Sequence, residues 1–171
     1  MRLQNGFTLI ELMITIAIMG VLMSIAAPSF QSIILGARLT SASNAMVSAL
    51  QLARSEAIKQ NKTVIVEPLS SNNWQSGWQV FVDTAGNGIY DPATDTLLTM
   101  FDAVNSSVTV NSSSNSIFYE ATGRLPSGVS SSVIFCTNAD NQDFRAVVIS
   151  LTGRVHVETS SNSSRTYASS C

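Results

Sequence analysis

Glu11 is the only charged residue in an apolar run that extends from Phe7 to Phe30. A carboxylate at the centre of a bilayer costs about 2.5–3.5 kcal/mol on insertion scales. Because Glu11 lies about one helical turn inside the start of the run, nearby lipid headgroups relieve part of that cost. Two interpretations stay open: a carboxylate that its position makes harmless, or one that awaits a positive partner within a protein assembly.

The chain contains two cysteines, Cys136 and Cys171. In an exported protein such a pair typically forms a disulfide. The bridge would close a loop of about 35 residues and contribute ~3.5–4 kcal/mol through the entropy of the unfolded chain. Two free thiols are the alternative. The sequence has no C-x-x-C pair and no Cys/His cluster, so we expect no zinc site.

The segment from Asp83 to Thr94 partly matches the pattern of a calcium-binding loop. With Asp83 at position 1 of such a loop, Asn87 falls at position 5 and Asp91 at position 9. An alanine stands at position 3 and Thr94 at position 12, where a ligand and a bidentate glutamate are needed. We therefore favour an ordinary turn rich in Gly and Asn, and we expect neither a metal nor another cofactor.

Catalytic motifs are missing from the sequence. The single histidine, His156, alternates with valines in a strand-like Val155-His156-Val157 segment, which is typical of a surface or packed side chain. No serine stands in a Gly-x-Ser-x-Gly context, and there is no phosphate-binding glycine loop, HExxH motif or paired-carboxylate motif. The net charge of −2 also argues against a globally basic nucleic-acid binder, although a local patch stays open. We do not expect an enzyme.

The segment from Phe7 to Ala27 is long enough to span a membrane. It forms about 31 Å of helix at ~1.5 Å per residue, which matches a bilayer core of ~30 Å. A secretory signal cut near Ser24-Ile25-Ala26 is one alternative, but such signals are shorter and lack an internal glutamate. A plain single-pass anchor is another, and it does not explain the position of Glu11.

The helical pattern continues beyond Pro28, where a proline inside a helix predicts a bend. We expect one helix over about residues 7–60, ending at Asn61. The apolar positions of its second part recur every three or four residues and form a small-residue stripe suited to a sheet: Leu35, Leu39, Ala42, Met46, Ala49, Ala53 and Ala57.

From Thr63 onwards the pattern is that of short strands separated by Gly, Pro, Asn and Ser. We expect polar turns at Ser70–Gln75 and Asp83–Pro92. A long helix followed by strands predicts an α+β fold with antiparallel sheets. The expected strands are Thr63–Glu67, Trp78–Val82, Leu97–Phe101, Val108–Val110, Ser116–Tyr119, Val133–Phe135, Arg145–Ser150 and Arg154–Glu158.

The N-terminus, MRLQNG followed by FTLIELM, resembles the class III signal of type IV prepilins and type II secretion pseudopilins. The resemblance implies that a prepilin peptidase cuts between Gly6 and Phe7 and methylates the new amino group of Phe7. It makes Glu11 the fifth mature residue, which would accept a charge-assisted bond from the Phe7 amine of its own chain or of a neighbour. Pro28 is similar in position to the helix-kinking proline of many pilins.

The globular part resembles the branch that contains GspH, FimU and FimT. The segments that carry this resemblance are Gly77–Asp83, Gly86-Asn87-Gly88 and Arg145–Val155. It implies a pilin-like fold, with two sheets packed on the second half of the long helix. We expect a prepilin leader at 1–6, a transmembrane and assembly helix at 7–30, and an extracytoplasmic β-rich domain at 31–171.

DNA binding is a further expectation from the resemblance. FimT-type minor pilins of DNA uptake carry a C-terminal Gly-Arg-x-Arg motif, and this chain has Gly153-Arg154-Val155-His156. Arg154 matches the first arginine, whereas His156 replaces the second and is mostly neutral at pH 7. Arg145 and Arg165 are candidate neighbours. We favour the alternative that Gly153 and Arg154 form a hairpin turn and an exposed strand residue.

These observations predict a structural minor pilin that assembles, primes or caps a type IV pilus. A DNA-binding minor pilin for natural transformation and a GspH-type pseudopilin of type II secretion are the alternatives. Expected partners are other major and minor pilins, the prepilin peptidase and the inner membrane, with a pilus-tip adhesin and DNA as further candidates. The subunit would cross the inner membrane once, with a periplasmic domain, and then enter a cell-surface filament.

Overall fold

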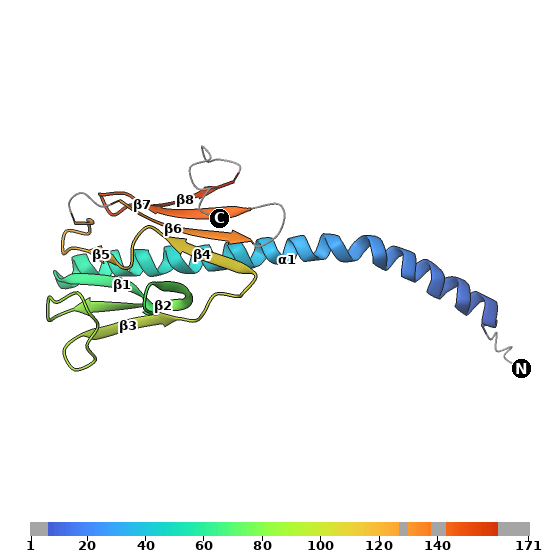
Figure 1. Ribbon diagram of the computed structural model, residues 1–171, viewed down its shortest axis with the longest axis horizontal. Coiled ribbons are helices and arrows are strands. Elements are labelled where there is room, and N and C mark those ends of the chain that lie inside the picture. The colour runs from blue at the N-terminus through green and yellow to red at the C-terminus, as the bar shows by residue number, and fades with distance from the viewer. Residues whose placement is uncertain (1–6, 127–129, 138–142, 161–171) are drawn as a thin grey trace, which may run out of the picture. The chain divides into compact units, whose positions relative to one another are not determined.

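The computed structural model describes residues 7–126, 130–137 and 143–160, apart from the side chains of residues 25–29. The chain divides into two compact units, Met1–Leu35 and Gly36–Cys171. The described part of the first unit is the beginning of helix α1 (Leu9–Gln60). The second unit holds the rest of α1 and, within the described ranges, eight strands (Figure 1).

Helix α1 ends where the sequence predicts. Asn61 adopts a left-handed backbone with φ of 52°, which asparagine tolerates better than most residues. The next amide, of Lys62, donates to the carbonyl oxygen of Ala57 at 3.3 Å, which is the bond of a Schellman cap. The backbone is helical through Pro28. The side chain of Pro28 lies outside the described residues, and the bend there stays a prediction.

The strands form two antiparallel sheets, which we name sheet A and sheet B. Sheet A has the order β3-β2-β1-β5 and consists of β1 (Thr63–Ser70), β2 (Asn73–Asp83), β3 (Thr96–Phe101) and β5 (Ile117–Tyr119). Sheet B has the order β4-β6-β7-β8 and consists of β4 (Val108–Ser112), β6 (Ser131–Thr137), β7 (Phe144–Ile149) and β8 (Val155–Thr159).

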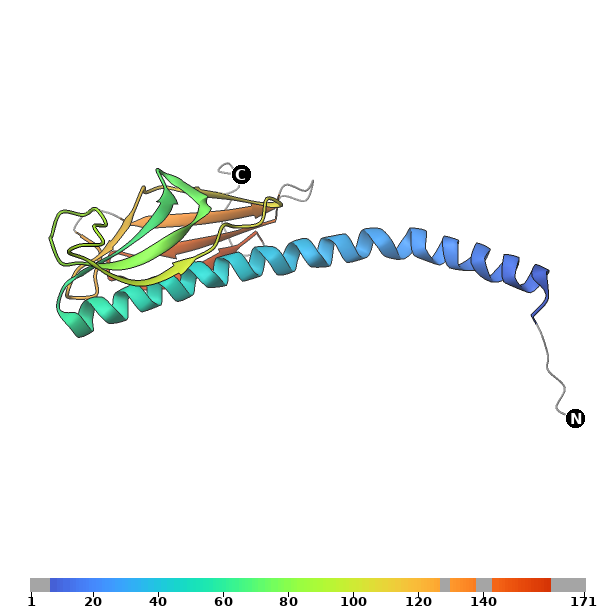
Figure 2. The same cartoon turned by 90° about the horizontal axis from the view of Figure 1, so that it is seen from below.

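Within the second unit, both sheets lie on one side of the C-terminal part of α1 (Figure 2). This is the α+β arrangement of a long helix and antiparallel sheets that the sequence predicts, and the prediction is confirmed.

The expected turn at Ser70–Gln75 is wrong in its extent. β1 continues through Pro68 to Ser70, with an irregular register between these two residues, and β2 begins at Asn73. A two-residue turn with a left-handed Asn72 joins the strands. The reason is Trp74, which is buried and donates its indole N–H to the carbonyl oxygen of Ser114 at 3.0 Å. Burial of the Trp74 side chain stabilises strand structure here, although the neighbouring residues are polar.

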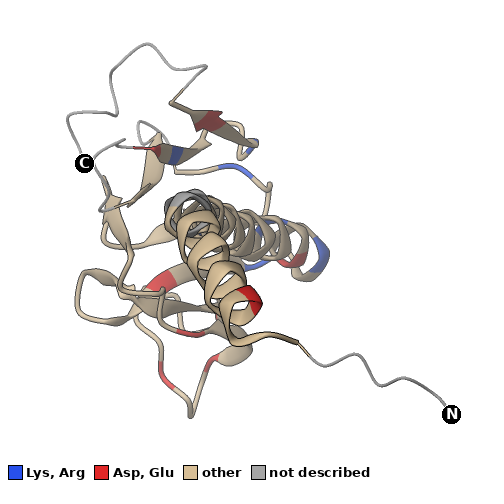
Figure 3. Ribbon diagram, turned by 90° about the vertical axis from the view of Figure 1, so that its right-hand side faces the viewer, with Lys and Arg blue, Asp and Glu red and all other residues tan. Residues whose placement is uncertain are grey.

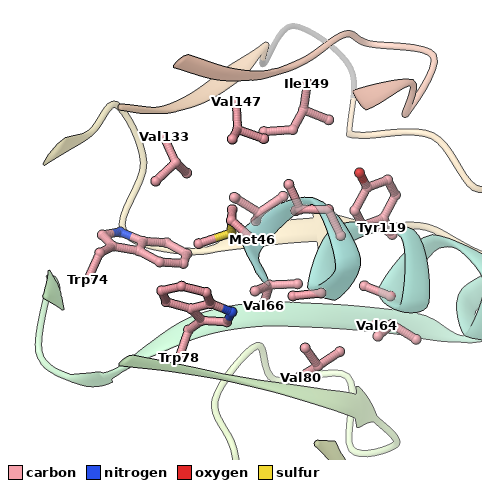
Figure 4. Close-up of a cluster of buried hydrophobic side chains, with 14 of the residues drawn as sticks. Met46, Val64, Val66, Trp74, Trp78, Val80, Tyr119, Val133, Val147 and Ile149 are labelled. Carbon is pink, nitrogen blue, oxygen red and sulfur yellow. The ribbon is translucent and has the colours of Figure 1, made fainter. Parts of the chain in front are cut away.

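The core lies between α1 and the inner faces of the two sheets (Figure 4). Alanines on the helix let the backbones approach closely, and larger side chains from the strands fill the remaining space. Met46 projects from the helix between the two tryptophans and sheet B. Fully buried members of this core include Met46, Ala49, Leu50, Ala53, Ala57, Val64, Val66, Val80, Tyr119, Val133, Phe135, Val147 and Ile149.

Candidate functional site

The first candidate site is the beginning of α1, where Thr8 and Glu11 form a capping box. The Thr8 amide and hydroxyl donate to Glu11 Oε2 at 3.1 and 2.9 Å, and the Glu11 amide donates to Thr8 Oγ1 at 3.3 Å. This reciprocal pair satisfies amide groups that have no partner within the helix. The Glu11 carboxylate therefore has a local partner in the single chain, which the sequence analysis did not anticipate.

The capping box leaves the Glu11 carboxylate exposed, close in sequence to Phe7, which is the first described residue. Phe7 and the large apolar residues that follow on α1 are exposed, from 85% at Phe7 to 52% at Ile14. A carboxylate has about four lone-pair positions. Glu11 can thus keep its Thr8 bonds and still accept a bond from a further donor, such as an amine.

Two stretches of α1 are apolar helices by length and composition, Leu9–Ser24 and Phe30–Gln60. Phe30–Gln60 is long enough for a membrane span, and Leu9–Ser24 lies within the longer apolar run from Phe7 to Ala27. The apolar residues of Phe30–Gln60, however, include Met46, Leu50 and Ala53, which are fully buried in the domain core. Core packing accounts for the buried stripe from Leu39 to Ala57, whereas Phe30, Ile33 and Ile34 at the start of this stretch are exposed, like the apolar side chains of Leu9–Ser24.

The predicted cleavage site lies between Gly6 and Phe7, and Gly6 lies outside the described residues.

Cys136 is disulfide-bonded, and it lies in a second buried cluster with Ile134, Phe144 and Ala146. Cys171 also lies outside the described residues, so its pairing with Cys136 stays a prediction. Arg165 lies outside them as well.

In the loop after β2, the aspartate carboxylates accept hydrogen bonds from backbone amides. Asp83 accepts hydrogen bonds from the amides of Gly86, Asn87 and Gly88 at 2.7, 3.2 and 3.0 Å. The Asn87 side-chain oxygen accepts from the Ile89 amide at 3.0 Å. These bonds occupy the oxygens that a calcium ion would need.

Asp95 closes the same loop from its other end. It accepts from the amides of Asp91, Thr84 and Ala85 at 2.9, 2.9 and 3.3 Å. The Asp91 amide, followed by those of Thr84 and Ala85, holds the pKa of Asp95 below its usual value. Among the described residues, no group of three or more His, Cys, Asp or Glu side chains could hold a metal. The geometry is that of a carboxylate-organised turn.

The three residues suggested for DNA do not gather in one patch. Arg145 pairs with Thr159 and shares the inner face of sheet B with Val147, whereas His156 pairs with Val148 on the outer face. His156 Nε2 also lies 3.3 Å from Glu158 Oε1, and this carboxylate repels phosphate. Arg154 immediately precedes β8 and lies five residues before Thr159, the partner of Arg145, which is about 17 Å along the strand at ~3.4 Å per residue.

Gly153 and Arg154 belong to a hairpin turn, as the favoured alternative expects. The Gly153 amide donates to the Ser150 carbonyl oxygen at 2.8 Å, and the Ser150 amide donates to the Arg154 carbonyl oxygen at 3.0 Å. Gly153 has φ of 75°, and a Cβ there would overlap the carbonyl oxygen of Gly123. The three-residue loop ending in a left-handed glycine is a common hairpin connection.

A second arginine-bearing turn adjoins this hairpin, and the sequence analysis missed it. The Leu125 amide donates to the Leu151 carbonyl oxygen at 3.2 Å, so the Gly123-Arg124 turn lies beside the Gly153-Arg154 turn. Both Arg124 and Arg154 are exposed. The repeated Gly-Arg dipeptide was the available sequence signal, but only the fold shows that the two copies are neighbours.

Arg54 on α1 is hydrogen-bonded to both turns, and the sequence analysis did not identify it either. Its Nε and NH2 groups donate to the carbonyl oxygens of Gly123 and Thr152 at 3.0 and 3.1 Å. Tyr119 donates to the Gly153 carbonyl oxygen at 3.4 Å. Burial raises the pKa of Tyr119, and the nearby Arg54 charge only partly opposes this shift, so the hydroxyl stays a donor.

Two family models match the chain. The model described as Type II transport protein GspH matches residues 42–153, and the model of the prokaryotic N-terminal methylation motif matches residues 1–27. The second match covers the capping box and the apolar start of α1. The first covers most of the two-sheet unit.

The curated relatives match mainly through part of their length. A fimbrial protein of Pseudomonas aeruginosa is 45% identical over 65 residues, which is 38% of this chain and 42% of the relative. The type IV major alpha-pilin of Moraxella bovis is 40% identical over 73 residues, 43% of this chain and 45% of the relative. The chain thus spans less than half the length of these relatives.

Solved structures share the fold of the globular part. The type IV minor pilin FimU of Pseudomonas aeruginosa is 24% identical with a TM-score of 0.59, covering 72% of this chain and 90% of FimU. The minor pseudopilin EpsH from the type 2 secretion system of Vibrio cholerae is 11% identical with a TM-score of 0.53, covering 71% of this chain and 96% of EpsH. At these identities the likeness concerns the fold.

The apolar N-terminal helix and its methylation motif are features of proteins that are membrane-anchored and assemble into pili. Since the GspH model accounts for residues 42–153 of a 171-residue chain, more than half of its length, the chain belongs to the GspH family of type IV minor pilins and type II secretion minor pseudopilins.

Proposed function

We propose that this chain is a minor pilin that initiates or caps a type IV pilus, as a structural subunit without catalytic activity. The observation that carries the proposal is the start of α1, where an exposed apolar helix begins with the Thr8–Glu11 capping box directly after Phe7. Such a helix needs an apolar environment, which a membrane supplies before assembly and neighbouring helices supply in a filament.

In this proposal the leader 1–6 is removed by a prepilin peptidase, and Phe7 becomes a methylated N-terminus. The helix at 7–30 then crosses the inner membrane once, with residues 31–171 in the periplasm. On assembly, Glu11 accepts a bond from the Phe7 amine of its own chain or of a neighbour while Thr8 continues to cap the helix. Pairing of the two charges offsets the cost of burying each of them.

Deletion of the gene tests the role of the subunit. A minor pilin that initiates assembly predicts a deletion strain with few or no surface filaments, restored by the wild-type gene. Electron microscopy of surface filaments is the measurement. Normal piliation with loss of exoprotein secretion would instead assign the chain to type II secretion, which is the second family role.

Processing is tested separately. Gly6→Ala is expected to leave the full-length precursor in the membrane, because the motif that this chain resembles has glycine before the cut. Immunoblotting of membranes separates precursor from mature chain. Cleavage of Gly6→Ala at the wild-type rate would contradict the processing step.

A DNA-binding role is kept as a second candidate because of one observation, the adjoining Gly123-Arg124 and Gly153-Arg154 turns. Two exposed arginines on neighbouring turns provide phosphate contacts, and each lost contact reduces the salt dependence of binding. Gel shifts of the micelle-solubilised chain at low salt test this role. Binding that is unchanged in the Arg124→Ala, Arg154→Ala double variant would rule it out.

A further inference from the structure

Charge is unevenly distributed along the globular unit. Residues 63–123 contain no Lys or Arg, although they form all four strands of sheet A, strand β4 and the long loop after β2. In Figure 3 the acidic segments of this stretch lie along sheet A and its loops. The acidic residues are Glu67, Asp83, Asp91, Asp95, Asp102 and Glu120.

The outer face of sheet A combines this negative charge with exposed apolar side chains. Leu97 pairs with Phe81, and Met100 pairs with Gln79, on the face opposite the core residue Val80. Leu97 and Met100 are 38% and 54% exposed. Both lie on β3, whose outer edge has no partner strand among the described residues. An exposed edge with apolar side chains requires a cover or a partner.

The loop between β2 and β3 adds a fixed apolar anchor to the same face. Its tip residue, Ile89, is 69% exposed. The loop is held by the backbone hydrogen bonds to Asp83 and Asp95, and Tyr90 packs on Phe81 with ring centroids 5.1 Å apart. Because the loop is ordered before any contact, a partner that covers Ile89 loses little conformational entropy.

Next to these apolar residues lie three carboxylates. Glu67 stands in the row that continues through Gln79 to Met100, and it accepts from Gln79 Nε2 at 2.8 Å. Asp91 follows the Ile89-Tyr90 tip, and Asp95 precedes β3. We name the acidic face by six residues: Glu67, Ile89, Asp91, Asp95, Leu97 and Met100.

We propose that the acidic face is the surface on which the globular domain of a neighbouring pilin subunit docks, through a basic surface with an apolar centre. The charge selects this occupant. The six residues of the acidic face include three carboxylates and no cation, and Lys62 Nζ lies beside the loop, 3.4 Å from Thr84 Oγ1. The three carboxylates repel phosphate groups, so the face suits neither nucleic acid nor an anionic leaflet. Apolar anchors surrounded by charge of one sign are suited to a folded protein surface of the opposite charge. The inference rests on the proposed function, since it takes the partner to be a filament subunit.

Site-specific photocrosslinking of the full chain in its own cells tests the inference. A benzophenone amino acid replaces Ile89 or Met100, and the matched control places it at Asn111, an exposed residue of β4 in sheet B. We expect an adduct with a second pilin-type subunit from both acidic-face positions, at least tenfold above the control. Mass spectrometry of the adduct should place the partner's crosslinked peptide among basic residues.

Charge variants then test the chemistry of the contact. Asp91→Asn keeps the shape and the acceptor for the Ala93 amide, and Asp91→Lys reverses the charge. We expect the Ile89 adduct to fall about threefold with Asp91→Asn and more than tenfold with Asp91→Lys. Glu158→Lys on sheet B should leave it unchanged.

The inference is overturned by no adduct, by equal adducts from Asn111, or by an adduct whose partner is not a pilin subunit. Insensitivity of the adduct to Asp91→Lys would also overturn it. Its failure is distinguishable from failure of the proposed function. A wild-type chain that enters filaments without an Ile89 adduct defeats only this inference, whereas a chain absent from filaments defeats both.

Discussion

The two parts of helix α1 are both apolar, yet their side chains have opposite surroundings. In Leu9–Ser24 the large apolar residues are 52–77% exposed. In the later part, Met46, Ala49, Leu50, Ala53 and Ala57 are fully buried beneath two sheets. Hydropathy alone assigns both parts to the same class.

What separates the two parts is the size and spacing of the side chains. The first part carries Leu, Ile, Met and Val around the whole helix, so every face needs an apolar partner. From Leu39 to Ala57 the second part places alanines on the buried stripe and mostly polar residues elsewhere, which suits close packing against strands. A helix that is apolar all round is suited to a membrane or a bundle of like helices, whereas an alanine stripe is suited to a sheet.

The largest expected effect concerns the first part. Glu11→Gln retains a capping-box partner for Thr8 but removes the charge, whereas Thr8→Ala removes the cap and retains the charge. If Glu11 acts through a charged amine, Glu11→Gln and Glu11→Ala should lower incorporation into filaments by about tenfold or more. Thr8→Ala should stay within about twofold, since a lost cap costs only about 1 kcal/mol.

Quantitative blots of sheared filaments against membranes measure the incorporation of each variant. All of them should be processed. If the Glu11→Gln variant enters filaments like the wild type while the Thr8→Ala variant does not, Glu11 serves as a helix cap instead.

The second prediction compares equal truncations in the two parts. Leu50→Ala removes a fully buried side chain, and the free energy of unfolding of the domain should fall by about 2–5 kcal/mol. Leu12→Ala changes a residue that is 56% exposed and should leave domain unfolding unchanged. Denaturant unfolding of both chains in the same micelles measures the difference. A loss of domain stability with Leu12→Ala would contradict the division.

The third prediction concerns the turns that contact the buried part of the helix. Gly153→Ala introduces a Cβ that overlaps Gly123, at a left-handed position, and should cost about 3 kcal/mol or more. Gly86→Ala has a similar φ of 72° but open space, so only the conformational cost of about 1 kcal/mol applies. Thermal melting ranks the two variants, and equal losses would show that the Gly123 contact contributes nothing.

The smallest expected effect is the pH dependence of the loop after β2. Backbone amides lower the pKa of Asp95 in the folded state, so its contribution is present above the unfolded value near 3.9 and is lost as the pH falls through the folded value. The melting difference between wild type and Asp95→Asn should therefore be constant from about pH 7 to 5 and vanish in stronger acid. A difference that grows on acidification would contradict the assignment.

Most of the fold could be predicted because local signals agreed. The alanine stripe predicted the helix face, Asn61 predicted the helix end, and alternating residues predicted the strands. The turn at Ser70–Gln75 was misplaced because Trp74 is buried by contacts with residues distant in sequence. Local polarity carries no information about such a contact.

The sites were predicted less completely. The Thr8–Glu11 capping box was present in the sequence as Thr-x-x-Glu, but the membrane context drew the interpretation toward a missing partner. Arg145 and His156 looked close to Arg154 in sequence, yet strand alternation puts them on opposite faces. Arg124 lies beside Arg154 through a contact between distant turns, which only the three-dimensional arrangement reveals.

The most direct measurement is the N-terminal mass of this chain in purified, sheared surface filaments. The account predicts that the chain is present there and that its first residue is N-methylated Phe7. A chain that retains residues 1–6, or that is confined to the membrane fraction while filaments form normally, would contradict it.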